Sequence, residues 1–171
     1  MRILACPRLR AVPNRTRFLV MTKPDPRQPA SGWFDGTAHV FALRVYYEDT
    51  DFSGRVYHAS YLRFMERGRT EFLRDADVHH GGLLKADEPL TWAVRRMKID
   101  FLGPAQMDDV LQIRTYVMKL GGARLQLAQS VMRGSQELVK ADVEVCLITL
   151  DGRARRVPDA IRRKLQNFTA P

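Results

Sequence analysis

The chain has 171 residues, 45% of them apolar, which is enough for one domain with a buried core. No apolar run approaches the roughly 20 residues of a membrane-spanning helix, so we expect a soluble protein. The net charge of +9 comes from the ends, because residues 1–24 contribute +6, residues 153–164 contribute +5 and the stretch between them −2. A nucleic-acid-binding domain is expected to carry its basic residues on the folded body. This distribution therefore argues against nucleic acid as a partner.

Residues 1–36 are predicted to form a disordered basic extension. They hold five prolines and show no sustained period of 2 or 3.6 residues. An arginine-rich leader without acids is also compatible with an organelle transit peptide, whereas its apolar runs are too short for a secretory signal. We favour a third interpretation, in which Met21 is the biological start. Peptide mapping of the natively expressed protein would test it.

The predicted domain, residues 37–168, begins with a strand and a long helix. The apolar positions of residues 39–45 alternate, which is typical of a strand. A helix is predicted from about Tyr57 to Asp75, because apolar residues recur there at spacings of 4, 3 and 4. Gly68 lies on this stripe and costs about 1 kcal/mol relative to alanine inside a helix. We therefore expect another backbone to pack closely against it.

After the helix the period changes to two. Alternating residues predict four further strands, within residues 96–101, 111–117, 125–131 and 139–147, and a short helix after Pro158. The short turns between the strands favour an antiparallel meander. The predicted fold class is α+β, a five-stranded antiparallel sheet wrapped around one long central helix. Such a sheet keeps an exposed edge strand, so dimerisation is expected.

Three carboxylates lie just ahead of the helix, in the segment YYEDTDFSGRVYHASY at residues 46–61. An acid at such a place either caps the helix and faces water, or is aimed at a substrate. Glu48 and Asp49 are interpreted as turn-forming residues or as structural partners of Arg44 and Arg55. The turn at Gly54 brings Asp51 back toward the helix start, where free N–H groups and roughly half a positive charge stabilise a developing oxyanion. This combination suits an attack by a carboxylate or by water on a carbonyl group.

The segment of residues 46–74 resembles the signature of hotdog-fold acyl-CoA thioesterases. It is most similar to the Tol–Pal-associated branch called YbgC, a relative of hydroxybenzoyl-CoA thioesterase. The resemblance covers about residues 38–168, including the turn FLGPAQMDD. The matching elements are Tyr-Tyr-Glu-Asp-Thr-Asp at 46–51, Gly54, Val56-Tyr57-His58, Tyr61, Glu66-Arg67, Arg69-Thr70-Glu71 and Arg155 with Pro158.

The resemblance implies a cytoplasmic enzyme with the hotdog fold that hydrolyses acyl-CoA, or a thioester of acyl carrier protein, at the interface of a homodimer or homotetramer. It implies no metal or other cofactor. Asp51 matches the family's catalytic carboxylate, which acts as general base or nucleophile. The backbone N–H at His58 matches the group that polarises the carbonyl. The predicted substrate-binding residues are Tyr57, Gly54, Arg155 and Arg124. Arg155 matches a basic position of the family and is a candidate for the phosphates of coenzyme A; Arg124 is a weaker candidate, because family members often have small hydroxyl residues there.

Two rival functions stay open. A hotdog hydratase or dehydratase needs a histidine paired with a carboxylate of the facing subunit, and no matching signature follows residue 80. A non-enzymatic binding module would use the basic ends for peripheral association with a membrane surface or for an acidic carrier protein.

Two other groups of residues suggest metal or redox chemistry, but their spacing argues against it. His79 and His80 beside Asp77 are interpreted as a solvated loop, because adjacent side chains rarely converge on one ion. Cys6 and Cys146 match no metal or redox spacing and are typical of a reducing compartment.

Overall fold

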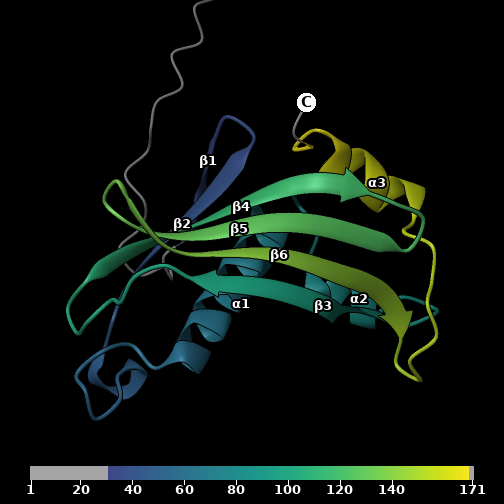
Figure 1. Ribbon diagram of the computed structural model, residues 1–171. Helices are drawn as coiled ribbons and strands as arrows, with labels where there is room; N and C mark the ends of the chain where they lie inside the picture. Colours follow the sequence, from purple (N-terminus) through teal and green to yellow (C-terminus); the bar gives the residue numbers. More distant parts are fainter. Residues whose placement is uncertain (1–30, 170–171) are drawn as a thin grey trace, which may run out of the picture.

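Six antiparallel strands form one sheet that curls around the long helix α1 (Figure 1). The structure is a computed structural model and describes residues 31–169. No helix in that range is both long and apolar enough to cross a membrane. In chain order the elements are β1 Trp33–Asp35, β2 Ala38–Arg44, the 3-10 turn η1 Tyr47–Asp49, α1 His58–Asp75, α2 His80–Leu84, β3 Leu90–Phe101, β4 Val110–Leu120, β5 Arg124–Arg133, β6 Gln136–Thr149 and α3 Asp159–Gln166.

The strand order β1-β2-β4-β5-β6-β3 corrects the predicted meander. Strands β4, β5 and β6 follow one another as expected, but β3 pairs with β6 at the far edge and not with β4. The reason is that β2 already occupies the other side of β4, from His39 opposite Thr115 to Arg44 opposite Val110. Strand β3 therefore pairs with the free side of β6.

The sheet also has one strand more than the five predicted. Strand β1 lies within residues 1–36, so the ordered domain begins before the expected boundary at residue 37. Its three residues are too few to show alternation, although Asp35-Gly36 is a typical hairpin signal and Gly36 has a φ of +62°. Residues 1–30 lie outside the described residues, so their disorder and the start at Met21 stay predictions.

Helix α1 is confirmed and packs its apolar stripe against the sheet. Tyr61, Met65, Gly68 and Phe72 are all buried. A Cβ atom at Gly68 would lie 2.7 Å from Cγ2 of Ile113 in β4. The close approach predicted at Gly68 is therefore present, but the neighbour is a side chain and not a backbone.

Replacement of Gly68 by valine is expected to lower the free energy of unfolding by about 2 kcal/mol or more. Extra methyl groups in a packed core typically cost 1–3 kcal/mol, and the neighbouring Ile113 is fully buried. Urea denaturation at fixed protein concentration measures the change. Gly81→Val in α2 is the control, because nothing lies within 4 Å of a Cβ atom there. Equal stability of the two variants would contradict the packing argument.

A buried polar network fixes α1 on the sheet. The guanidinium of Arg69 donates to Oε1 of Gln129 in β5 (2.7 Å) and also to Glu66 one turn earlier. The amide of Gln129 donates to the carbonyl of Met65 (3.0 Å) and to the hydroxyl of Thr115 (2.9 Å). Because every side chain of this network has a hydrogen-bond partner, the network sets how α1 lies across β4 and β5.

Candidate active site

Asp51 lies in a tight turn between η1 and α1. Its N–H donates to the carbonyl of Arg55 (2.8 Å), and the N–H of Gly54 donates to the carbonyl of Asp51 (2.9 Å). Gly54 has a φ of +74°, in the left-handed region that favours glycine. The turn reverses the chain, so Asp51 comes back toward the start of α1.

The first turn of α1 carries free backbone donors. No side chain among the described residues caps the helix, and Tyr57 before it is extended, with φ −61° and ψ 133°. The N–H of Tyr57 donates to the carbonyl of Asp49 (2.9 Å), whereas the N–H groups of His58 and Ala59 have no acceptor within residues 31–169. Asp49 itself is buried and accepts the N–H of Tyr46 (3.0 Å), which explains why this acid is structural.

Asp51 and His58 border the same open depression, which has a volume of about 400 Å³. Its opposite side is formed by the end of β3 and the following turn. The N–H of Val56 donates to the carbonyl of Ala105 (2.9 Å), and the N–H of Ala105 donates to the hydroxyl of Tyr61 (2.8 Å), which holds that turn against the loop. The lining residues are Asp51, Ser53, Arg55, Val56, His58, Tyr61, Phe101, Leu102, Gly103 and Pro104.

The carboxylate of Asp51 is exposed and ionised. Its Oδ1 accepts the hydroxyl of Ser53 (2.6 Å) and the N–H of the same residue (2.8 Å). These two hydrogen bonds, followed by the charge of Arg55, lower the pKa of Asp51 below its ordinary value. At neutral pH this group is therefore able to accept a proton or to attack a carbon atom, but not to donate a proton.

Comparison with known proteins identifies the family of the chain. The family model of the thioesterase-like superfamily matches residues 45–165, which is most of the chain. The protein belongs to the thioesterase-like superfamily.

Individual relatives of this thioesterase-like protein also have names that identify them as thioesterases. It is 43% identical over 110 residues to the acyl-CoA thioesterase YbgC of Haemophilus influenzae, covering 64% of this chain and 80% of the relative. It is 39% identical over 121 residues to the acyl-CoA thioester hydrolase YbgC of Escherichia coli O6:H1, covering 70% and 89%. A probable thioesterase of Bartonella henselae has the same fold, with a TM-score of 0.69, 48% identity and coverage of 71% and 99%. The resemblance to hotdog thioesterases is thus confirmed.

Two residues of this thioesterase-like chain that were predicted to bind the substrate, Arg155 and Arg124, lie far from Asp51. Arg155 donates to Glu88 (2.5 Å), and its N–H donates to the carbonyl of Leu147, which pairs with Trp92 in β3. Trp92 lies nine positions before Phe101, roughly 30 Å away at the rise of a strand. Arg124 lies at the same end of the sheet, 3.7 Å from Glu144. Within one chain, neither arginine reaches the depression.

Two tyrosines lie close to the helix start, in different settings. Tyr57 is half-exposed, and its ring lies 4.4 Å from that of His58. Tyr61 is buried, and burial raises the pKa of its hydroxyl above the ordinary value. Tyr61 is therefore a neutral wall of the depression at physiological pH.

Sequence reasoning missed one whole side of the depression. The turn at residues 101–104 was recognised as part of the family resemblance, but nothing in its composition connects it with Asp51. The connection arises from the position of β3 at the sheet edge and from the pairing of Arg55 with Gln106. Ser53 was also missed, although Asp-x-Ser-Gly is a recognisable turn pattern.

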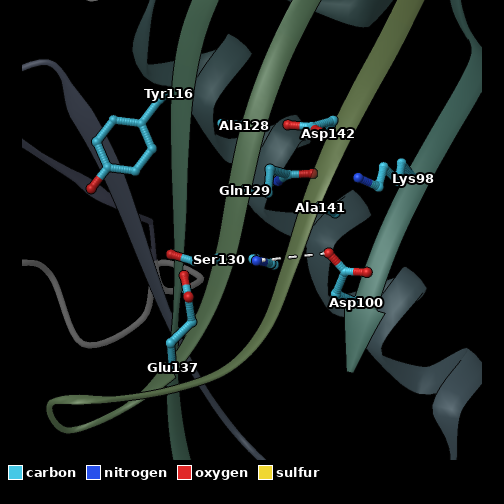
Figure 2. A pocket seen from close by; sticks show the side chains of 10 residues that line it. Lys98, Asp100, Tyr116, Ala128, Gln129, Ser130, Glu137, Ala141 and Asp142 are labelled. Atoms are coloured by element: carbon cyan, nitrogen blue, oxygen red, sulfur yellow. Dashed lines mark ion pairs between the residues drawn. The ribbon is translucent and has the colours of Figure 1, made fainter. Parts of the chain in front are cut away.

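The opposite face of the sheet holds a separate depression of about 350 Å³ (Figure 2). Side chains of both charges line it, and Lys140 lies 3.8 Å from Asp100 across the strands. None of the residues predicted for the site lines it. Among the described residues, none that lines this depression belongs to the start of a helix.

The histidine pair after α1 is arranged differently from the predicted loop. His80 begins the short helix α2, and Leu83 of this helix packs into the core. His79 lies 3.2 Å from Asp77, which also binds Lys164 (2.7 Å). Within residues 31–169, no group of three or more His, Cys, Asp or Glu side chains is placed to hold a metal ion.

Proposed function

We propose that the protein hydrolyses the thioester of acyl-CoA to a free acid and coenzyme A. One observation carries the proposal: an ionised carboxylate, Asp51, and the uncapped start of α1 border a single depression. The names of the YbgC relatives support the substrate class, since these proteins are called acyl-CoA thioesterases.

In the proposed reaction the thioester carbonyl oxygen accepts the backbone N–H of His58. The positive end of the helix dipole stabilises the negative charge that develops on this oxygen. Asp51 either removes a proton from the attacking water or attacks the carbonyl carbon and forms a mixed anhydride that water then cleaves. In both routes the carbon–sulfur bond breaks and the thiolate of coenzyme A leaves.

A panel of acyl-CoA substrates of increasing chain length, monitored by release of free thiol, tests this function. Thiol release from at least one member is expected. Crotonyl-CoA distinguishes the hydratase, which would remove the enoyl chromophore and leave the thioester intact. Silence across the whole panel would favour the non-enzymatic binding module.

A homodimer completes the proposed site. Strand β3 is an edge of the sheet and carries Val94 and Phe101, and Leu102 directly follows it; these three apolar side chains are about half exposed. Edge strands of this kind are commonly covered by pairing. Antiparallel pairing of β3 with its copy would bring the Arg155 end of one chain beside Asp51 of the other. This arrangement would let Arg155 and Arg124 contact the phosphates of coenzyme A, and two such dimers would form the tetramer.

Replacement of Val94 by lysine is expected to weaken the dimer at least tenfold, because the charge would have to be buried in the interface. Sedimentation velocity over a concentration series measures this change. Ser130→Lys, on the opposite face of the sheet, is the matched control and should leave this dimer intact. A wild-type protein that is monomeric at micromolar concentration would contradict the arrangement.

The cellular setting is part of the same proposal. The family resemblance supports a cytoplasmic enzyme linked to the Tol–Pal system, with thioesters of acyl carrier protein as a second substrate class. Cys146 is buried and forms no disulfide within residues 31–169. Cell fractionation would detect either a cytoplasmic protein or one bound peripherally to the membrane.

A further inference from the structure

Ser53 makes two hydrogen bonds to one oxygen of Asp51. Its N–H (2.8 Å) and its hydroxyl (2.6 Å) both donate to Oδ1. The backbone bond forms an Asx turn, which any residue except proline would keep at this position. The hydroxyl bond depends on the side chain, and its length is typical of a charge-assisted hydrogen bond.

The second oxygen of Asp51 has a different environment. Within residues 31–169, no N–H or O–H group lies in good hydrogen-bonding geometry with Oδ2, and Arg55 acts on the carboxylate through its charge and, more weakly, through its backbone N–H. The side chain of Asp51 is exposed and lines the depression together with His58. One oxygen is therefore held by two donors, while the other keeps its lone pairs for a reaction partner.

We propose that Ser53 is a positioning residue that holds Oδ1 of Asp51 and leaves Oδ2 as the reacting oxygen. The inference rests on the proposed function, because it assumes that Asp51 takes part in thioester hydrolysis. An exposed carboxylate rotates broadly about its last torsion angle, and two donors on one oxygen restrict that rotation. General base and nucleophile routes both need one oriented oxygen with a free lone pair, so the role of Ser53 is the same in each.

The hydrogen bonds from Ser53 also affect the pH dependence. The hydroxyl of Ser53 is the largest cause of the lowered pKa of Asp51, and the N–H of Ser53 is the second. Activity that needs ionised Asp51 is present above this pKa and is lost as the pH falls through it. Loss of the hydroxyl raises the pKa, so the acid limb of the kcat/KM profile moves to higher pH. A purely structural role for Ser53 would not move this limb.

The test compares Ser53→Ala, which removes the hydroxyl and keeps the N–H, with Ser53→Thr, which keeps both donors. In Ser53→Ala we expect kcat to fall about tenfold with little change in KM, because the reacting oxygen is less well oriented. The acid limb should move to higher pH. Ser53→Thr should restore kcat and the position of the limb. Thr50→Val removes a hydroxyl of the same loop that bonds to Tyr47 and not to Asp51, so the limb should not move.

Two results would overturn the inference: wild-type kcat with an unmoved acid limb in Ser53→Ala, or equal behaviour of the alanine and threonine variants. A carboxyl titration of Asp51 by NMR in the wild type and in Ser53→Ala gives a readout that needs no substrate. A wild type without any thiol release would refute the proposed function, and the titration would still test the hydrogen bond. An unchanged midpoint in Ser53→Ala would then overturn the inference separately.

Discussion

Turnover of acyl-CoA is expected to fall roughly 10²-fold or more in the Asp51→Asn variant. The amide has nearly the shape of the carboxylate, and its oxygen is still able to accept the two hydrogen bonds from Ser53. It is neither a base nor a nucleophile at neutral pH, so either route of thioester hydrolysis is blocked. Steady-state thiol release, with folding checked by circular dichroism, measures the loss.

Glu48→Gln is the matched control for Asp51→Asn. It removes a carboxylate of the same segment that lies in the 3-10 turn and does not line the depression. Its turnover should stay near that of the wild type. A folded Asp51→Asn variant with near-normal turnover would refute the assignment of Asp51. Turnover in ¹⁸O-labelled water adds a mechanistic readout, because label incorporated into Asp51 would demonstrate the mixed anhydride.

The second large effect is expected at the helix start, where proline and alanine at position 58 separate the backbone from the side chain. His58→Pro removes the N–H that is proposed to bind the oxyanion, and loss of one such donor costs about 10²–10³-fold in kcat. The backbone is suited to this change, because proline is tolerated at the first helical position. The φ of −61° and ψ of 133° at Tyr57 also suit a residue before proline.

His58→Ala keeps the N–H and removes the imidazole, so its kcat should stay within about threefold of the wild type. Thermal unfolding of both variants checks that α1 remains folded. Equal kcat values for the proline and alanine variants would contradict the backbone assignment. If both kcat values are equally low, the catalytic role at position 58 belongs to the imidazole instead.

Local features of the fold were accessible from the sequence. The predicted helix from Tyr57 to Asp75 agrees with α1 within one residue, because its stripe recurs every three to four positions. Strands β4, β5 and β6 were recognised from alternation. The first half of β3 was missed because the register shifts between Val94 and Arg96 and breaks the alternation. The candidate pairing of Asp51 with the helix start was also predictable, since only a turn of a few residues separates them.

Long-range features were not accessible from the sequence. The place of β3 beside β6 depends on which strand sides are already occupied, and that is a property of the whole sheet. The residues Phe101 to Pro104 line the depression only because of this placement. The same arrangement of strands separates Arg155 and Arg124 from Asp51 within one chain. No sequence motif predicts this separation.

The amino-acid sequence by itself determined the class of fold, the long helix and the short acidic segment before it, because neighbours in the chain form these features. The tertiary structure alone decided which distant turn faces Asp51, which oxygen of its carboxylate accepts the hydrogen bonds of Ser53 and where β3 joins the sheet. These depend on strand pairing and packing between residues many positions apart, where small differences in register move a side chain to another face or another end of the sheet.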